Sequence, residues 1–65
     1  MNADQLADKL NELLSTGKLN EAAMITLFRQ ADILRWESGC GEVAAYMNDN
    51  SVVAYERGRG WSVYR

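Results

Sequence analysis

The hydrophobic period of the chain changes near Gly39, and this change constrains the fold more than any other feature of the sequence. Before it, apolar residues recur at the spacing of an amphipathic helix; after Gly41, short runs are rich in β-branched and aromatic residues. A period of 3.6 residues places apolar side chains on one face of a helix, whereas a period of two places them on one face of a strand. The chain is therefore expected to be α+β, with helices first and strands second.

Residues 3–15 are predicted to form an amphipathic helix. Asn2 and Gln5 have the spacing of a capping box, in which each side chain accepts a hydrogen bond from the other residue's backbone N–H. Gly17 follows at a position where a helix commonly ends on a residue of positive φ. The apolar stripe of this helix is formed by Leu6, Leu10, Leu13 and Leu14.

A second helix is predicted from Asn20, which can cap it, through residue 36. Only residues 16–19 separate the two helices, so they are expected to be close neighbours. The apolar stripe of the second helix is formed by Met24, Leu27, Phe28, Ala31 and Leu34.

The C-terminal part is predicted to be a β-hairpin of residues 51–56 and 60–65, joined by a glycine-containing turn. Residues 42–47 fit a strand by their alternation and a helix by their alanines; the strand is favoured because an isolated hairpin is marginally stable. Residues 48–50, Asn-Asp-Asn, then form a turn. We expect two N-terminal helices packed on a small antiparallel sheet of two to three strands (α-α-β-β-β), as a single domain over residues 1–65.

The composition excludes most catalytic and metal chemistry. The 65 residues include no His and only one Cys, Cys40. Ser-His-Asp and Cys-His sites, and zinc held by His or several Cys, are therefore impossible within the chain. A domain of this size also has little volume for a deep substrate pocket. We expect no catalytic residues, no metal site and no cofactor, so the protein is not expected to be an enzyme.

Location and oligomeric state are constrained only loosely. The first residues lack a signal-peptide pattern, and no apolar run is long enough to span a bilayer. The chain is therefore expected to be cytoplasmic and to have no membrane partner. A small core without disulfide or zinc is expected to give a monomer or a weak homodimer.

Three acidic residues form a row on the first predicted helix. Asp4, Asp8 and Glu12 are spaced at i, i+4 and i+8, so they fall opposite the leucine stripe and about 6 Å apart along the axis. A row of negative charges at this interval coarsely resembles a nucleic-acid phosphate track. The same row is typical of a solvated helix face, but like charges at i, i+4 destabilise a helix, which favours a functional role.

The net charge of −2 is unevenly distributed. Residues 1–50 carry eight acidic and four basic residues, whereas residues 51–65 carry one and three. At the hairpin turn, an arginine can bind phosphate or carboxylate, or simply aid solubility. Tyr64 lies on the opposite strand face from Trp61, which is expected in the core, and exposed tyrosines are common anchors of protein interfaces. The candidate partner-binding residues are Asp4, Asp8, Glu12, Arg57, Arg59 and Tyr64.

In its length, its acidity, its lack of catalytic residues and its row of Asp4, Asp8 and Glu12, the chain resembles the small single-domain proteins that phages encode to disable host systems. Anti-CRISPR proteins of the type I kind are the best example. Such proteins share no motif, so the resemblance assigns no residue. It implies a non-enzymatic inhibitor that acts as a DNA mimic. Its partner would be a protein with a basic surface in a larger nucleic-acid-handling complex, such as a Cas subunit or effector complex, and it would not bind nucleic acid directly.

Two alternatives stay open at this point. A winged-helix-like DNA-binding module would use residues 42–48 as a third helix and the hairpin turn as a wing. That helix would carry no Lys or Arg for phosphate contacts. A small oligomerisation or adaptor subunit would instead use apolar side chains of the second helix that one neighbouring element does not cover.

Overall fold

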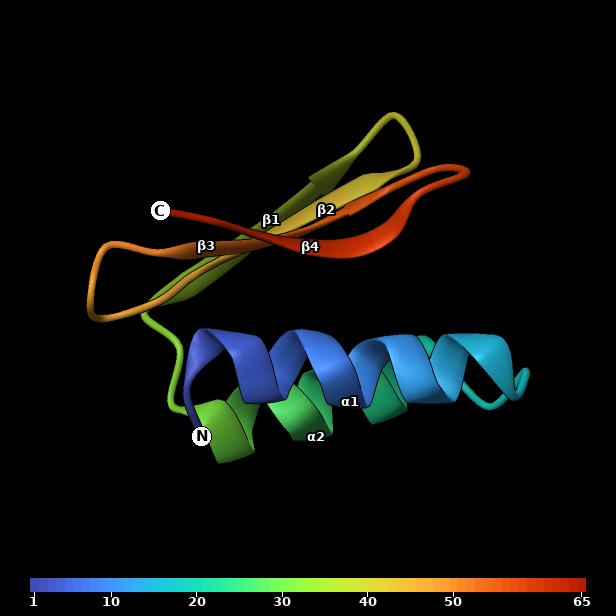
Figure 1. Ribbon diagram of the computed structural model, residues 1–65, viewed down its shortest axis with the longest axis horizontal. Coiled ribbons are helices and arrows are strands. Elements are labelled where there is room, and N and C mark those ends of the chain that lie inside the picture. The colour runs from blue at the N-terminus through green and yellow to red at the C-terminus, as the bar shows by residue number, and fades with distance from the viewer.

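The computed structural model describes all 65 residues as two layers, a pair of helices and an antiparallel sheet (Figure 1). The strands pair in chain order, and both helices lie on the same face of the sheet, so its other face is uncovered. The α+β prediction is confirmed, but the sheet has four strands rather than two to three. The elements are α1 (Ala3–Ser15), α2 (Glu21–Ala31), β1 (Arg35–Gly39), β2 (Glu42–Tyr46), β3 (Val52–Glu56) and β4 (Gly60–Tyr64).

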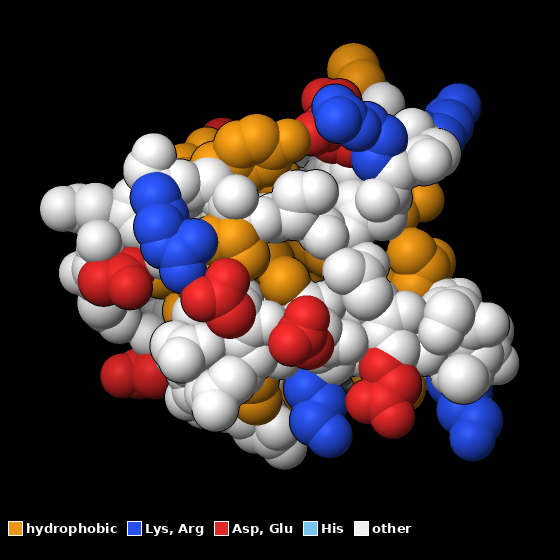
Figure 2. All heavy atoms as spheres, in the orientation of Figure 1, with side chains coloured by type: hydrophobic (Ala, Val, Ile, Leu, Met, Phe, Trp, Pro, Cys, Tyr) orange, Lys and Arg blue, Asp and Glu red, His pale blue; other side chains and the backbone are white.

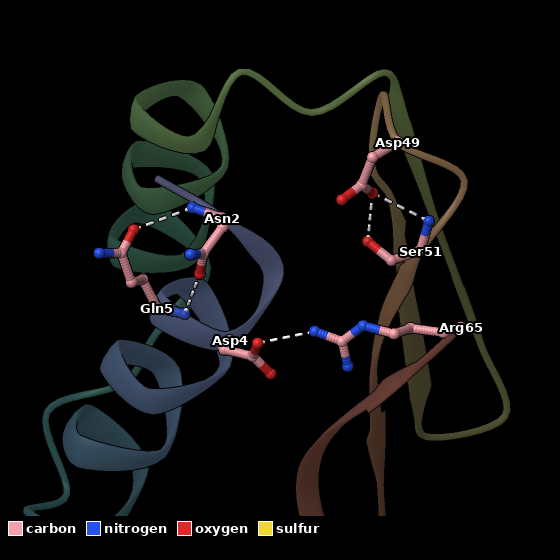
Figure 3. A network of polar contacts seen from close by, with 6 residues as sticks. All are labelled: Asn2, Asp4, Gln5, Asp49, Ser51 and Arg65. Atoms are coloured by element: carbon pink, nitrogen blue, oxygen red, sulfur yellow. Dashed lines mark hydrogen bonds and ion pairs between the residues drawn. The ribbon is translucent and has the colours of Figure 1, made fainter.

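Helix α1 begins and ends where the sequence predicts. The Asn2 side chain accepts from the Gln5 N–H at 2.8 Å, and the Gln5 side chain accepts from the Asn2 N–H at 2.9 Å (Figure 3). These two bonds form the predicted capping box. At the other end, Gly17 has a φ of +71° and the Lys18 N–H donates to the Leu13 carbonyl at 2.9 Å. Gly17 therefore ends the helix in the expected left-handed conformation.

Helix α2 begins as predicted but ends earlier. The Asn20 side chain accepts from the Ala23 N–H at 2.8 Å and caps the first turn. The helix then stops at Ala31, because Asp32 adopts a left-handed backbone with a φ of 55° and its N–H donates to the Arg29 carbonyl at 3.2 Å. The prediction of a helix through residue 36 was therefore wrong.

Residues 35–39 form a strand instead, and the side chains show why. Leu34, which the helical stripe placed toward the core, is 66% exposed. Trp36 is paired across the strands with Ala45, and its ring lies 5.7 Å from the ring of Phe28. Pairing with β2 satisfies alternate backbone groups of this segment and packs Trp36 on the core, so it prevails over the helical period.

Strands β1 and β2 form a hairpin whose two turn residues are Cys40 and Gly41. Both have positive φ, 53° and 78°, as in the turns that match the twist of a two-residue hairpin. Sequence analysis identified this segment only as a break and so missed β1. The predicted strand at residues 42–47 is confirmed by β2. Because residues 42–46 are a strand, the third helix that a winged-helix module requires is absent.

The predicted hairpin of β3 and β4 is confirmed. The Arg59 N–H donates to the Glu56 carbonyl at 3.0 Å, and Gly58, third in this turn, has a φ of +84°. The predicted turn at residues 48–50 joins β2 to β3. In it the Asp49 carboxylate accepts from both the hydroxyl and the backbone N–H of Ser51 (Figure 3). These bonds, the hydroxyl first, hold the pKa of Asp49 below its ordinary value.

One hydrophobic core lies between the helices and the inner face of the sheet. Its centre is formed by Leu6 and Leu10 of α1 and Val53 of β3, whose side chains are fully buried. Trp61 is 5% exposed, which confirms the core position predicted for it. The other buried hydrophobic residues are Ala3, Ala7, Met24, Leu27, Phe28, Ala31, Ala45 and Met47.

A pair of hydrogen bonds joins α1 to the edge strand β4. The Asn11 side chain accepts from the Trp61 N–H at 2.9 Å and donates to the Trp61 carbonyl at 2.9 Å. Gly60 permits this approach, because a Cβ there would lie 2.9 Å from the Asn11 Oδ1. The Asn11 side chain thus satisfies backbone groups of β4 that would otherwise be free at the edge of the sheet.

Replacing Cys40 with Asn is expected to stabilise the protein. A side chain in the left-handed region costs about 1–2 kcal/mol, and Asn-Gly is a favoured pair for this turn. We expect Cys40→Asn to raise the free energy of unfolding by about 0.5–1 kcal/mol, measured by urea denaturation. Cys40→Ala is the control, because it removes the thiol and keeps the strain. An equal gain in both variants would contradict the explanation.

Asn11→Ala is expected to lower the free energy of unfolding by about 1–3 kcal/mol, because it leaves two polar groups of Trp61 without partners in a partly buried position. Asn48→Ala is the matched control. Asn48 donates to the Asp32 carbonyl at 2.6 Å, but this bond is exposed, and water can replace the lost donor. Urea denaturation of both variants should therefore show a clearly smaller loss for Asn48→Ala, and equal losses would argue against the assigned role of Asn11.

Candidate functional site

The predicted acidic row on α1 is exposed but partly neutralised. Figure 2 shows acidic side chains along this helix with basic side chains beside them. Asp4 accepts from the guanidinium of Arg65 at 2.6 Å (Figure 3), and Glu12 lies 4.0 Å from Lys9. Only Asp8 makes no ion pair. The row is therefore less like a bare phosphate track than its spacing in the sequence suggests.

Arg57 and Arg59 of the hairpin turn are also exposed, and each contacts other residues of the chain. Arg59 is 3.8 Å from the Glu56 carboxylate. The Arg57 guanidinium lies against the neighbouring β1–β2 turn, where a Cβ on Gly41 would be 2.6 Å from Nη2. The tips of the two hairpins therefore meet at one end of the sheet. A phosphate-gripping role for these arginines would require them to leave these contacts.

The uncovered face of the sheet, called here the outer face, has small side chains at its middle. The cross-strand register places Ala44, Ala54 and Ser62 in one row. A shallow hollow of about 570 Å³ lies on this part of the sheet, because the alanines in particular leave space above the strands. Its lining includes Glu37, Glu42, Tyr46 and Glu56, as well as Cys40 of the turn.

Three carboxylates give the outer face its charge. Arg35 donates to Glu37 at 2.5 Å, and this hydrogen bond holds the pKa of Glu37 below its ordinary value. Glu56 accepts from the hydroxyl of Tyr64. The side chain of Glu42, the first residue of β2, makes no ion pair or hydrogen bond within the chain. It is the carboxylate of this face that is most available to an external cation.

Tyr64 is the only candidate from the sequence that belongs to the outer face itself. It is 47% exposed, and its hydrogen bond to Glu56, followed by desolvation, raises the pKa of its hydroxyl above the ordinary value. The other candidates lie on α1 and at the hairpin turn, so the structure does not bring the six into one site. All three glutamates of the outer face, Glu37, Glu42 and Glu56, were missing from the candidates that the sequence offered. The alternation of residues 42–46 carried a signal for Glu42, whereas the overlong second helix concealed Glu37.

Carboxylates, tyrosine rings and small side chains make up these surfaces. No three His, Cys, Asp or Glu side chains are grouped so that they could hold a metal ion. Neither helix has the length and apolarity that crossing a bilayer requires. Carboxylates and tyrosine rings around a shallow hollow can accept the basic side chains of another protein.

Comparison with protein-family models, with curated proteins and with solved structures finds no match to this chain.

Glu56→Gln is expected to lower the pKa of Tyr64 back toward 10.0, because an amide is a weaker acceptor and carries no charge. NMR titration of the ring signals would measure this shift. Because the pKa of Tyr64 is raised in the folded state, the hydrogen bond to Glu56 stabilises the fold below about pH 10. This contribution is lost as the pH rises through the pKa of folded Tyr64. The matched control is Glu12→Gln on α1, which should leave the pKa of Tyr64 unchanged. An unchanged value in Glu56→Gln would contradict the assignment.

Proposed function

We propose that the protein is a non-enzymatic binding protein that occupies a basic surface of a larger protein through the outer face of its sheet. The observation that carries this proposal is the hollow on that face, with its alanine floor and its three glutamates, Glu37, Glu42 and Glu56. The two helices cover the opposite face only, so nothing in the chain obstructs access to it (Figure 1).

The outer face suits the side chains of arginine and lysine. Its small residues let a long aliphatic stem lie flat, while the carboxylates at the border accept hydrogen bonds from the charged end. The chain itself contains an example of such a contact, because the guanidinium of Arg35 lies 4.1 Å from the centre of the Tyr46 ring. A second guanidinium, from a partner, could use Tyr64 and Glu42 in the same way.

A basic surface that ordinarily holds nucleic acid is the partner class we favour. Acidic side chains speed the encounter with such a surface and compete there with the polyanion. The protein would then act as a stoichiometric inhibitor of a nucleic-acid-handling complex, which is also what the resemblance to small phage-encoded inhibitors implies. The exposed Asp8 and Glu12 on α1 would add to the steering charge without forming the contact itself.

Charge reversal separates the outer face from the acidic row. Glu42→Lys/Glu56→Lys and Asp8→Lys/Glu12→Lys change the net charge equally, so any difference between them reflects position. We expect the wild-type protein to capture a basic partner from a host-cell lysate, the outer-face variant to lose that partner at least tenfold in affinity, and the α1 variant to retain most of the binding. Duplex DNA should compete with the wild-type protein for the purified partner.

The controls are circular dichroism of both variants, to show that they fold, and a gel-shift assay of the wild-type protein with duplex DNA. Loss of binding only in the α1 variant would move the site to the acidic row. Equal binding by wild type and both variants, or a salt-sensitive shift of DNA by the protein itself, would contradict the proposed function.

A further inference from the structure

The two edges of the sheet differ in how their backbone groups are satisfied. At β4, Asn11 bonds both the N–H and the carbonyl of Trp61. At β1, no side chain of the protein bonds the backbone. The residues that flank the two-residue turn, Gly39 and Glu42, form a hydrogen-bonded pair. Because bonded and non-bonded residues alternate along an antiparallel strand, the N–H and carbonyl groups of Trp36 and Ser38 point away from β2. Strand β1 is therefore an open edge that can accept another strand.

The exposed side chains of β1 are complementary to those of a second β1. If two copies pair antiparallel with Trp36 opposite Trp36, then Arg35 of each copy faces Glu37 of the other. Both side chains are more than half exposed, 58% and 59%, and lie on the outer face, where opposite charges across a strand pair are stabilising. A register centred on Glu37 would place two like charges opposite each other. Charge therefore selects the register centred on Trp36.

A surface of apolar and charged side chains continues from this edge toward α2, the charged ones being Arg29, Asp32 and Arg35. A groove of about 550 Å³ lies between α2 and β1. Leu34, at its border, is 66% exposed and is the most exposed large hydrophobic side chain of the protein. In the register centred on Trp36, Leu34, which directly precedes β1 and whose N–H donates to the Tyr46 carbonyl, lies next to Ser38 of the other copy. The apolar side chains that line the groove are Ile25, Phe28, Ile33, Leu34 and Trp36.

We propose that two copies of the chain associate by antiparallel pairing of their β1 strands, centred on Trp36, to form one continuous sheet. In the dimer, Arg35 of each copy pairs with Glu37 of the other copy, in place of the Arg35–Glu37 ion pair within one chain. Strand β1 is then no longer an edge, because it is paired on both sides. The two outer faces lie on the same side of the joined sheet, because residues of the same parity face each other. This inference rests on the edge of the sheet and does not require the proposed function.

Sedimentation equilibrium of the wild-type protein, with a reductant to keep Cys40 from forming a disulfide, tests the proposal. We expect the average mass to rise with concentration from that of one chain to that of two. Arg35→Glu and Glu37→Arg each place like charges opposite each other, so each variant alone should associate at least tenfold more weakly. Lys18→Glu, at the exposed α1–α2 turn, has the same change of charge as Arg35→Glu and should associate like the wild type.

Two further samples test whether a loss of association comes from the charges and not from misfolding of a variant. An equimolar mixture of Arg35→Glu with Glu37→Arg restores opposite charges at both positions, as does the double variant Arg35→Glu/Glu37→Arg, and both should regain the doubled mass. A wild-type protein that stays monomeric at all concentrations overturns the proposal and points to a strand of a different protein as the occupant of this edge. Association that is unchanged in both single variants, or is not regained in the mixture, also overturns it.

Discussion

The contact between one face of α1 and one face of the sheet is the interaction on which the rest of this structure depends. Leu6, Leu10 and Val53 are fully buried at its centre, and each buried side chain of this size contributes about 1.5–3 kcal/mol. Its single cysteine, Cys40, allows no disulfide within the chain. A domain of this length buries only about 60% of the surface that its unfolded chain exposes. The fold therefore depends on this single hydrophobic core for its stability.

A single core also decides which surfaces of the sheet face solvent. The two helices of this small domain can cover one face of a four-stranded sheet, and its other face stays in contact with solvent (Figure 1). The chain uses small residues at the middle of that face and glutamates at its border. The outer face is accordingly polar and negatively charged at its border and open at its middle.

The edges of the sheet show a similar division. Asn11 reaches from α1 to the backbone of Trp61 and closes the β4 edge, and Gly60 makes room for it. Strand β1 is not protected in this way and carries Arg35 and Glu37 instead. Charged residues on an edge strand usually oppose pairing with other chains, but alternating opposite charges become attractive when the second strand has the same sequence in the right register. In the proposed pairing, the same residues oppose other associations and favour this one.

The sequence by itself determined the elements whose signals are local. The capping box of Asn2 and Gln5, the glycine that ends α1, the hairpin of β3 and β4 and the core position of Trp61 all follow from short-range spacing, and the structure confirms them. Only the tertiary structure decided that α2 stops at Ala31 and that residues 35–39 pair with β2. It also decided that Arg65 neutralises Asp4, and that Glu37, Glu42 and Glu56 share one face. The physical reason is that pairing between strands and contacts between distant charges join residues that no local period relates, so their energies enter only when the whole chain is folded.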